Sequence, residues 1–417
     1  MRDFLDAEQS KGLGRASGPA AAAGENPDSR RGGVDRYGVY RDWMKKLARK
    51  GWIAPAWPKE YGGAGMTVMQ QFVFNEEMAR ARAPRPGGIG VGFAGPTIIT
   101  YGTEEQKKEH LPLLVSGDAV WCQGFSEPGS GSDLASLQTR AVRDGDDYVI
   151  NGQKIWTSGA QFAQRMILLA RTDPDAPKHK GISYFLLDMK SPGVTVRPLV
   201  NMANSAAFNE VFFEDVRVPK KDLLGEENRG WYVAATTLDF ERSSIGAAIA
   251  QQTQVEDLIL FVREGAGDGV TVHPTVKLEL AERSIEAETA RLLSYRVITL
   301  QTKGMVPNHE ASAAKLYSSE LSQRVAATGM RLVGLYGLLD RDRKAEAEAA
   351  ANRYAPRRGR LMRAYVNAVS STIAGGTSEI QRNIIAQRGL GLAGLGRIGG
   401  SGSSLTGSVR IAPHDAS

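Results

Sequence analysis

Three short segments carry the side chains best suited to bind a ligand, and the first is residues 126–133 (SEPGSGSD). It directly follows an apolar stretch with the composition of a strand. Gly129 and Gly131 allow a ligand to approach the backbone closely, and successive N–H groups together with serine hydroxyls can donate hydrogen bonds to a phosphate. A plain Gly/Ser turn between two strands is the other interpretation of this segment.

The second segment lies one hairpin later, at residues 154–160 (KIWTSGA). Trp156 can stack on a planar ring, and the hydroxyls of Thr157 and Ser158 can donate hydrogen bonds to the edge of that ring. A packed strand end explains the same residues, so the segment is a ligand site only if other features of the chain support it.

The third segment is residues 373–383 (IAGGTSEIQRN). A Gly-Gly break precedes an amphipathic helix, and Thr377 or Ser378 is the expected N-cap. The N-terminus of a helix can bind an anion through its free N–H groups. The segment therefore predicts either an ordinary helix start or an anion or cofactor site.

A carboxylate on an apolar helical stripe is a fourth candidate. Glu241 stands in residues 238–243 (LDFERS). Residues three and four positions away are its neighbours on a helix, and none of them carries a positive charge. These neighbours are Thr237, Leu238, Ser244 and Ile245. Glu241 is therefore either paired with a residue distant in the sequence or functional.

Other patterns look functional but lack the context that their chemistry needs. G-x-G-x-x-G occurs at residues 90–95 and 389–394, but the first runs into Pro96 and the second is too near the end for a strand–helix–strand unit to follow. The five histidines are scattered, and none is paired at the spacing of metal ligands. They are His110, His179, His273, His309 and His414. We expect neither a dinucleotide-binding fold of the Rossmann type nor a metal site.

The composition describes the scaffold that must position these segments. The chain has 417 residues, of which 42% are hydrophobic and 24% are charged, with a net charge of +6. This length predicts two or three domains. The charge is mild and contains no dense basic block, so we expect no nucleic-acid partner. Cys122 is the only cysteine, no apolar run is long enough to span a membrane, and the N-terminus is unlike a cleavable signal, so a cytoplasmic protein is expected.

Periodicity divides the chain into helical, β and helical parts. Helical patterns cover residues 37–115 and return from residue 230 to about 392, with breaks expected at residues 263–274, 303–309, 334–337 and 344–359. Between them, short β-rich runs with turn residues predict an antiparallel sandwich or barrel. The expected domains are residues 1–118, 119–229 and 230–392. Residues 11–35 and 393–417 are expected to be a loose surface segment and a flexible tail.

Taken together and in this order, the motifs resemble the acyl-CoA dehydrogenase superfamily. The resemblance runs from Gly51 (GWIAPAWPKEYGGAG) through YGTEEQK, WCQGFSEPGSGSD, NGQKIWTSGA, FFEDVRVP, GEENRGW and AKLYSSE to GGTSEIQRN. It implies an α+β fold with an N-terminal helical domain, a middle antiparallel β-domain and a C-terminal helical bundle. It also implies non-covalent FAD and a homotetramer or homodimer in which a neighbouring subunit completes the flavin site.

The resemblance implies a role for residues in all three segments. Along the flavin it places Gln123, Phe125, Ser126, Gly131 and Ser132, and at the other side of the ring system Trp156, Thr157 and Ser158. Thr377 and Glu379 would also contact FAD, and Arg263 would reach the FAD of a partner subunit. The Phe and Gln that the family carries after this arginine are not evident here, and a second glycine-rich flavin motif appears only as residues 331–337.

The resemblance also identifies the base. Many members carry a catalytic Glu directly before the Gly-Thr of the third segment, where this chain has Gly375. Other members place a Glu followed by Arg on the first long helix of the C-terminal domain, and Glu241 with Arg242 matches them. Glu241 would abstract the α-proton of an acyl thioester, and the N–H of Gly375 would polarise its carbonyl. Ser132 would meet the pantetheine of CoA, Asp239 and Arg242 its nucleotide end, and Leu238 with residues 93–100 the acyl group.

Within the family, a helix-borne base goes with long, branched or bulky acyl chains, including sterol side chains. An electron-transfer flavoprotein is the electron acceptor that the resemblance implies, and fatty acid or lipid metabolism is the expected setting. Two alternatives stay open: a flavin oxidase on the same fold, and a non-catalytic partner subunit of a heteromeric dehydrogenase. The acyl group could also be attached to a carrier protein instead of CoA.

Overall fold

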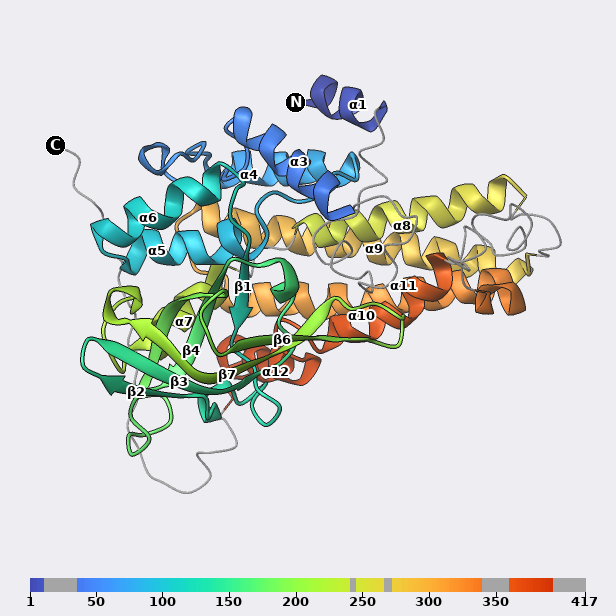
Figure 1. Ribbon diagram of the computed structural model, residues 1–417. Coiled ribbons are helices and arrows are strands. Elements are labelled where there is room, and N and C mark those ends of the chain that lie inside the picture. The colour runs from blue at the N-terminus through green and yellow to red at the C-terminus, as the bar shows by residue number, and fades with distance from the viewer. Residues whose placement is uncertain (11–35, 241–244, 266–271, 340–359, 393–417) are drawn as a thin grey trace, which may run out of the picture.

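The computed structural model describes residues 1–10, 36–240, 245–265, 272–339 and 360–392. Helices come first, a single sheet follows, and long helices complete the chain (Figure 1). The predicted order of helical, β and helical parts is confirmed. The exact domain limits stay a prediction, and residues 11–35 and 393–417 lie outside the described residues.

The N-terminal helices pack around buried aromatic side chains, and two of them begin with the same capping pattern. Thr67 accepts a hydrogen bond from the N–H of Gln70, and Thr103 does so from Gln106, while each glutamine side chain bonds back to the N-cap N–H. These helices are α1 (Arg2–Ser10), α3 (Arg36–Arg49), α4 (Val68–Arg80), α5 (Gly95–Tyr101) and α6 (Glu104–Val115), with a 3-10 turn η3 (Lys59–Tyr61).

The glycine pattern at residues 90–95 lies inside this helical part. Residues Gly90–Ala94 form a π-helical turn, η4, which leads directly into α5. The element directly before it is the helix α4 and not a strand, so the segment does not have the setting of the phosphate loop in a strand–helix–strand unit. Gly90 and Gly95 are needed for packing instead, because a Cβ there would overlap Leu114 and Trp57, respectively.

The middle of the chain forms one mixed sheet, most of whose pairings are antiparallel. Strand β4 pairs with β5 antiparallel but with β1 and β2 parallel. The order is β1-β4-β2-β3-β7-β6, with β5 also on β4. The strands are β1 (Trp121–Gly124), β2 (Arg140–Asp144), β3 (Asp147–Lys154), β4 (Arg165–Arg171), β5 (Ile182–Asp188), β6 (Val194–Leu199) and β7 (Phe208–Pro219).

Side chains of the central strands alternate between two cores. Ile167 and Leu169 of β4 join the core of the N-terminal helices, whereas Met166 and Leu168 join a core on the opposite face of the sheet. The sheet is therefore buried on both faces at β4, and its β1 edge lies against the N-terminal helices.

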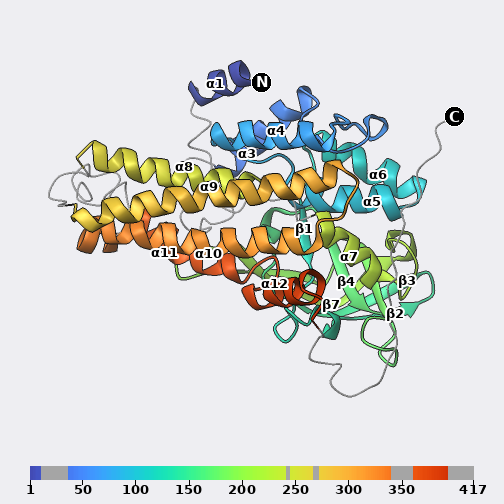
Figure 2. The ribbon, with the colours of Figure 1, turned by 180° about the vertical axis from the view of Figure 1, so that it is seen from behind.

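The C-terminal helices begin at α7 (Gly230–Phe240), which packs on the sheet, and continue as long helices that lie side by side (Figures 1 and 2). The breaks predicted at residues 263–274, 303–309 and 334–337 are found between them, and residues 344–359 lie outside the described residues. The helices are α8 (Ile245–Arg263), α9 (Pro274–Thr302), α10 (Asn308–Val333), α11 (Arg360–Ala368) and α12 (Ser378–Ile384), with 3-10 turns η8 (Gly334–Leu338) and η11 (Val369–Thr372) and a π-helical turn η12 (Ile385–Gly389).

In the described part of the chain, no helix has both the length and the apolar character needed to cross a membrane. The expected cytoplasmic location stays a prediction.

Candidate functional site

The first candidate segment is a tight loop that follows β1. The N–H of Glu127 donates to the carbonyl of Ser130 (2.8 Å), and the N–H of Ser130 donates back to the carbonyl of Glu127 (3.0 Å). Ser126 is half-buried, as is Gln123 within β1, whereas Gly131 and Ser132 are exposed. The loop therefore holds its own shape and presents its backbone and one hydroxyl to solvent.

The glycines of this loop are not required by the protein's own packing. A Cβ on Gly129 or Gly131 would meet no described atom within 4 Å. Neither residue has a positive φ, so the backbone conformation does not demand glycine either. What the two glycines provide is space directly above the loop, where a ligand can lie against the backbone.

A buried ion pair anchors the loop to the end of β3. The Nζ atom of Lys154 lies 2.7 Å from Oε1 of Glu127 and donates to the carbonyl of Phe125 (3.1 Å). Lys154 has no exposed surface, and the side chain of Glu127 is 8% exposed. The Glu127 carboxylate also accepts hydrogen bonds from two backbone N–H groups, that of Thr139 at the same Oε1 (2.8 Å) and that of Gln138 at Oε2 (2.6 Å).

Both groups of this pair have shifted pKa values. Burial lowers the pKa of Lys154 to about 8, although the negative charge of Glu127 opposes that shift. Burial alone would raise the pKa of Glu127, but the charge of Lys154 and the hydrogen bonds to the carboxylate outweigh it, and its pKa lies below the ordinary value. Each buried charge is therefore stabilised by the opposite charge of its partner.

The second candidate segment is joined to the first where β3 ends. The N–H of Ile155 donates to the carbonyl of Ser126 (2.9 Å). The next residue, Trp156, has φ +61° and is 59% exposed, and its ring meets Phe208 edge to face at 6.0 Å. A left-handed backbone costs a bulky residue about 1–2 kcal/mol, and such strain is typical of functional sites. The indole is free to stack on a planar ligand.

Thr157 carries a buried hydroxyl without a partner. Its backbone pairs with Asn209 in both directions, at 3.0 and 3.1 Å. Its Oγ1 atom is buried and has no hydrogen bond to any residue that the structure describes. Such groups are rare in folded proteins and require an explanation. A ligand that forms a hydrogen bond with Thr157 would provide this explanation. The next residue, Ser158, is half-buried.

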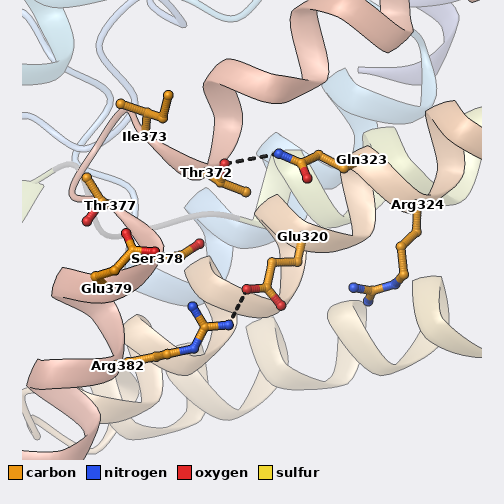
Figure 3. Close-up of a pocket in the computed structure, with 9 residues that line it drawn as sticks. All are labelled: Glu320, Gln323, Arg324, Thr372, Ile373, Thr377, Ser378, Glu379 and Arg382. Carbon is orange, nitrogen blue, oxygen red and sulfur yellow. Dashed lines mark hydrogen bonds and ion pairs between the residues drawn. The ribbon is translucent and has the colours of Figure 1, made fainter.

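The third candidate segment lines a recess of about 460 Å³ between α10, η11 and α12 (Figure 3). Thr377 caps α12 by accepting a hydrogen bond from the N–H of Ile380 (3.2 Å), and the buried Oγ of Ser378 has no partner among the described residues. The lining residues are Glu320, Gln323, Arg324, Thr372, Ile373, Thr377, Ser378, Glu379 and Arg382. A recess of this size can hold part of a cofactor.

The turn before α12 contains two consecutive glycines with a left-handed backbone. Gly375 has φ +66° and Gly376 has φ +84°, a conformation that favours glycine. Lys315 donates to the carbonyl of Gly376 (2.6 Å), and Gln381 donates to that of Gly375 (3.2 Å). Gly375 is exposed, and its N–H makes no hydrogen bond to a described residue, so it is available to a ligand.

The fold leaves Arg263 apart from the other candidate segments. The third segment begins α12, which packs against α10, whereas the first two segments belong to the sheet. Arg263 is the exposed last residue of α8, at the end of the helical bundle that points away from the sheet. Arg263 therefore cannot contribute to a site that the other candidate residues of the same chain form.

Three hydroxyls, which the sequence did not reveal, connect α5, α7 and the sheet beside the expected acyl pocket. Thr97 and Thr237 are 2.9 Å apart at their Oγ1 atoms, and the hydroxyl of Tyr184 lies 3.3 Å from Thr237. Burial raises the pKa of Tyr184. The ring of Phe125 is buried against Tyr184 at 5.9 Å, so only the backbone of Phe125 can face a ligand.

The expected base lies just outside what the structure describes. Helix α7 ends at Phe240 and α8 begins at Ile245, and Glu241 and Arg242 fall in the gap between them. Leu238, in the last turn of α7, is half-buried and packs against the core that α7 shares with the sheet. The placement of Glu241 therefore stays a prediction.

The fold also brings together a polar group that spacing along the chain does not reveal. Potential ligand atoms of Glu109, His110 and Asp222 lie within 4.8 Å of one another. Arg165 and Lys221 already pair with Glu109, at 3.2 and 3.4 Å. Both ion pairs balance the charge of Glu109. His110 is 1% exposed, and burial lowers its pKa from 6.5 to about 4.

His110 should make the stability of the protein depend on pH. Between pH 6.5 and 4 the unfolded chain binds a proton that the folded chain excludes, so lowering the pH over this range destabilises the fold by about 3 kcal/mol. Urea unfolding of wild type and His110→Gln at several pH values measures this. The variant should lose less stability on acidification, and parallel curves for the two proteins would contradict the assignment.

Models of known protein families match nearly all of the N-terminal helical, middle β and C-terminal helical parts of the chain. The sequence model for "Acyl-CoA dehydrogenase, N-terminal domain" matches residues 26–118, that for the middle domain matches residues 122–216, and that for the C-terminal domain matches residues 228–390. The chain is similar to acyl-CoA dehydrogenase IpdE1 of Mycobacterium tuberculosis, with 36% identity over 355 residues that cover 84% of this chain and 88% of that protein.

Two solved structures are similar over almost their whole length. "Tcur3481-Tcur3483 steroid ACAD" has a TM-score of 0.78 and 34% identity, and the match covers 94% of this chain and 95% of that one. The ChsE4-ChsE5 complex from Mycobacterium tuberculosis has a TM-score of 0.75 and 35% identity, over 94% of this chain and 97% of that one. Each of these two printed names joins the names of two different proteins.

Proposed function

The chain belongs to the acyl-CoA dehydrogenase family, and on this premise we propose that it dehydrogenates a long, branched or bulky acyl-CoA at the α and β carbons, with FAD bound and Glu241 as the base. The observation that carries the proposal is the junction of the first two candidate segments. Glu127 and Lys154 fix the loop against the end of β3, directly before the exposed Trp156.

The residues at this junction suit FAD. Trp156 offers an exposed aromatic face for the flavin ring, and Thr157 offers a buried hydroxyl that lacks a partner. Gly131 leaves open space above the loop, and Ser378 adds a second unpaired buried hydroxyl at α12. We propose that Gln123, Phe125 (through its backbone), Ser126, Ser132, Ser158, Thr377 and Glu379 complete the cofactor site.

In the proposed reaction the chain supplies orientation, hydrogen bonds and a base. The N–H of Gly375 donates to the thioester oxygen and stabilises the charge that develops there. The carboxylate of Glu241 takes the α-proton as general base. A bound FAD would supply the acceptor for the hydride that leaves the β-carbon. Asp239 and Arg242 are proposed to hold the nucleotide end of CoA, and Ser132 its pantetheine.

Thr157 provides a test of the cofactor site that does not depend on turnover. Thr157→Val replaces an unpaired buried hydroxyl by a methyl group, so the stability of the FAD-free protein should stay equal or rise by up to about 1 kcal/mol. FAD affinity should fall about 5–10-fold through the loss of one hydrogen bond. Fluorescence titration measures the affinity, and Thr157→Ser is the control. Equal affinity of the valine variant and wild type would remove Thr157 from the site.

The substrate proposal rests on the position of the base and on the names of the similar structures. A glutamate after α7 would stand beside Leu238 and residues 93–100, which we propose as the walls of the acyl pocket. One similar structure is named a steroid dehydrogenase, which supports a bulky acyl group. A panel of acyl-CoA thioesters of differing length and branching, assayed with an electron-accepting dye, tests this. Equal rates across the panel would contradict it.

For the assembly we propose a homotetramer or homodimer, in which Arg263 of one subunit completes the FAD site of another. Its place at the far end of α8 supports contact across a subunit boundary rather than within one chain. Because the names of both similar structures pair two proteins, a heteromer with a related subunit is the second candidate. We propose an electron-transfer flavoprotein as electron acceptor. Peroxide formed without any added acceptor would indicate an oxidase instead.

A further inference from the structure

Helix α6 and the turn after β7 place two buried polar side chains without partners close together. His110 is 1% exposed, and its Nε2 atom has no hydrogen bond to any residue that the structure describes. Asp222 ends the 3-10 turn η7 (Lys220–Asp222) and is 7% exposed. Its carboxylate likewise forms no hydrogen bond or ion pair within the described part of the chain. Buried polar groups of this kind are rare and require an explanation.

Gln106 fixes the position of His110 relative to Asp222. The Nε2 atom of Gln106 donates to the carbonyls of Lys221 (2.7 Å) and Leu223 (2.9 Å), the residues on either side of Asp222. His110 stands one turn after Gln106 on the same face of α6. The hydrogen bonds of Gln106 therefore hold the imidazole of His110 beside η7.

A third potential metal ligand, Glu109, stands at the rim of this site. Its side chain is 39% exposed, and its Oε1 atom lies 4.0 Å from Nε2 of His110. One ligand atom from each of Glu109, His110 and Asp222 lies within 4.8 Å of the others. Ligands of a tetrahedral zinc ion are about 3.4 Å apart at its usual bond lengths, so the three side chains need to close by about 1 Å. The exposed carboxylate of Glu109 can make this movement.

The charges around the site leave room for a cation. The carboxylates are those of Glu109, Asp222 and Asp188, and the cations that face them are Arg165 and Lys221. Lys221 is largely exposed, and Arg165 already lies 3.9 Å from Asp188. Both cations can leave Glu109 at small cost, because exposed ion pairs contribute little to stability. A metal ion can therefore take their place beside Glu109.

We propose that Glu109, His110 and Asp222 bind one zinc ion, with water as a further ligand, and that the ion links α6 to the end of β7. One imidazole and two carboxylates suit zinc, whereas Mg²⁺ and Ca²⁺ prefer oxygen ligands alone. The ion gives His110 and Asp222 the partner that each lacks. The expectation of no metal site rested on the spacing of the histidines along the chain, which does not report Asp222.

This zinc site serves the fold, and the inference does not depend on the proposed function. Trp121, the first residue of β1, packs edge to face against His110 at 5.3 Å. The candidate flavin loop follows the other end of β1. Zinc at His110 therefore stabilises the contact between the N-terminal helices and the sheet, away from the loop.

The test uses the full chain after a chelator has removed metal ions. Isothermal titration calorimetry with Zn²⁺ should show one site per chain, and Mg²⁺ at equal concentration should not occupy it. His110→Gln and Asp222→Asn should each lower the zinc affinity by at least about 10–100-fold, since losing a residue that merely supports a ligand already has that effect. Zinc should also raise the Tm of wild type more than that of either variant. The pH dependence of stability expected from His110 belongs to the metal-free protein and is measured with chelator present.

Two further variants separate this site from other places where zinc can bind. His309→Gln is the matched control, because Nδ1 of His309 lies 3.4 Å from a carboxylate oxygen of Glu310 on another helix, and it should bind zinc as wild type does. Glu109→Gln changes an exposed side chain, so it serves even where the buried variants do not fold, and its zinc affinity should fall about 10-fold or more.

Two results would overturn the inference. The first is a wild-type chain that binds no zinc. The second is zinc affinity that stays at the wild-type level in Glu109→Gln and in whichever buried variant folds, because the ion would then lie elsewhere on the protein.

Discussion

Replacing Glu241 by Gln is expected to slow the reduction of bound FAD by acyl-CoA on the order of 10³-fold, with FAD still bound. The amide has nearly the same shape as the carboxylate but cannot accept the α-proton, and removing a positioned base typically costs 10²–10⁴-fold. Anaerobic stopped-flow mixing with acyl-CoA, followed by the visible absorbance of the flavin, measures the rate of this step directly.

The matched control is Glu264→Gln, which alters an exposed glutamate just beyond α8. It should reduce FAD at the wild-type rate. If Glu241→Gln also stays within a few-fold of wild type while holding FAD, proton abstraction belongs to another group. Gly375 could not supply it, because glycine has no side chain, so the base would have to be sought elsewhere in the acyl pocket.

Lys154→Met is expected to destabilise the protein by about 3–5 kcal/mol and to weaken FAD retention. The substitution leaves the Glu127 carboxylate buried without its counter-charge, and breaking one side of a buried pair has this typical cost. The same change releases the loop that follows β1 from the end of β3. Chemical unfolding followed by circular dichroism measures the stability, and flavin content after gel filtration measures retention.

A double variant serves as the control for this pair. Glu127→Gln combined with Lys154→Met removes both charges and leaves an amide oxygen that can still accept one of the two backbone hydrogen bonds, from Gln138 or from Thr139. It should recover part of the lost stability, as expected when two interacting residues are changed together. A cost below about 1 kcal/mol for Lys154→Met alone would show that the pair does not hold the loop.

Local sequence signals predicted most of the helical architecture. Two further helix starts, which we did not predict, carry an equally local signal: Thr67 and Thr103 each have a glutamine three positions later, and the structure forms both capping boxes. The breaks near Gly304 and Gly334 fall where long apolar periodicity is interrupted, and both glycines have positive φ. Thr377 is the N-cap of α12, one of the two alternatives that the sequence left open. Each of these features is decided within a few residues of chain.

Features that depend on contacts distant in sequence could not be predicted. The parallel pairing of β1 with β4 arises because the β2–β3 hairpin intervenes between them, and no local pattern reports it. Lys154 and Glu127 both stand in candidate segments, but only the fold shows that they pair. The left-handed backbone of Trp156 is a conformation that its residue type does not favour.

The most direct test of dehydrogenation by this chain is an anaerobic titration of the FAD-loaded protein with a bulky acyl-CoA, followed by mass analysis of the thioester. The flavin absorbance should fall in proportion to added substrate until each bound flavin is reduced, and the product should be an enoyl-CoA that has lost two hydrogen atoms. Flavin that stays oxidised across a broad set of acyl-CoA thioesters, with each thioester recovered unchanged, would contradict the account.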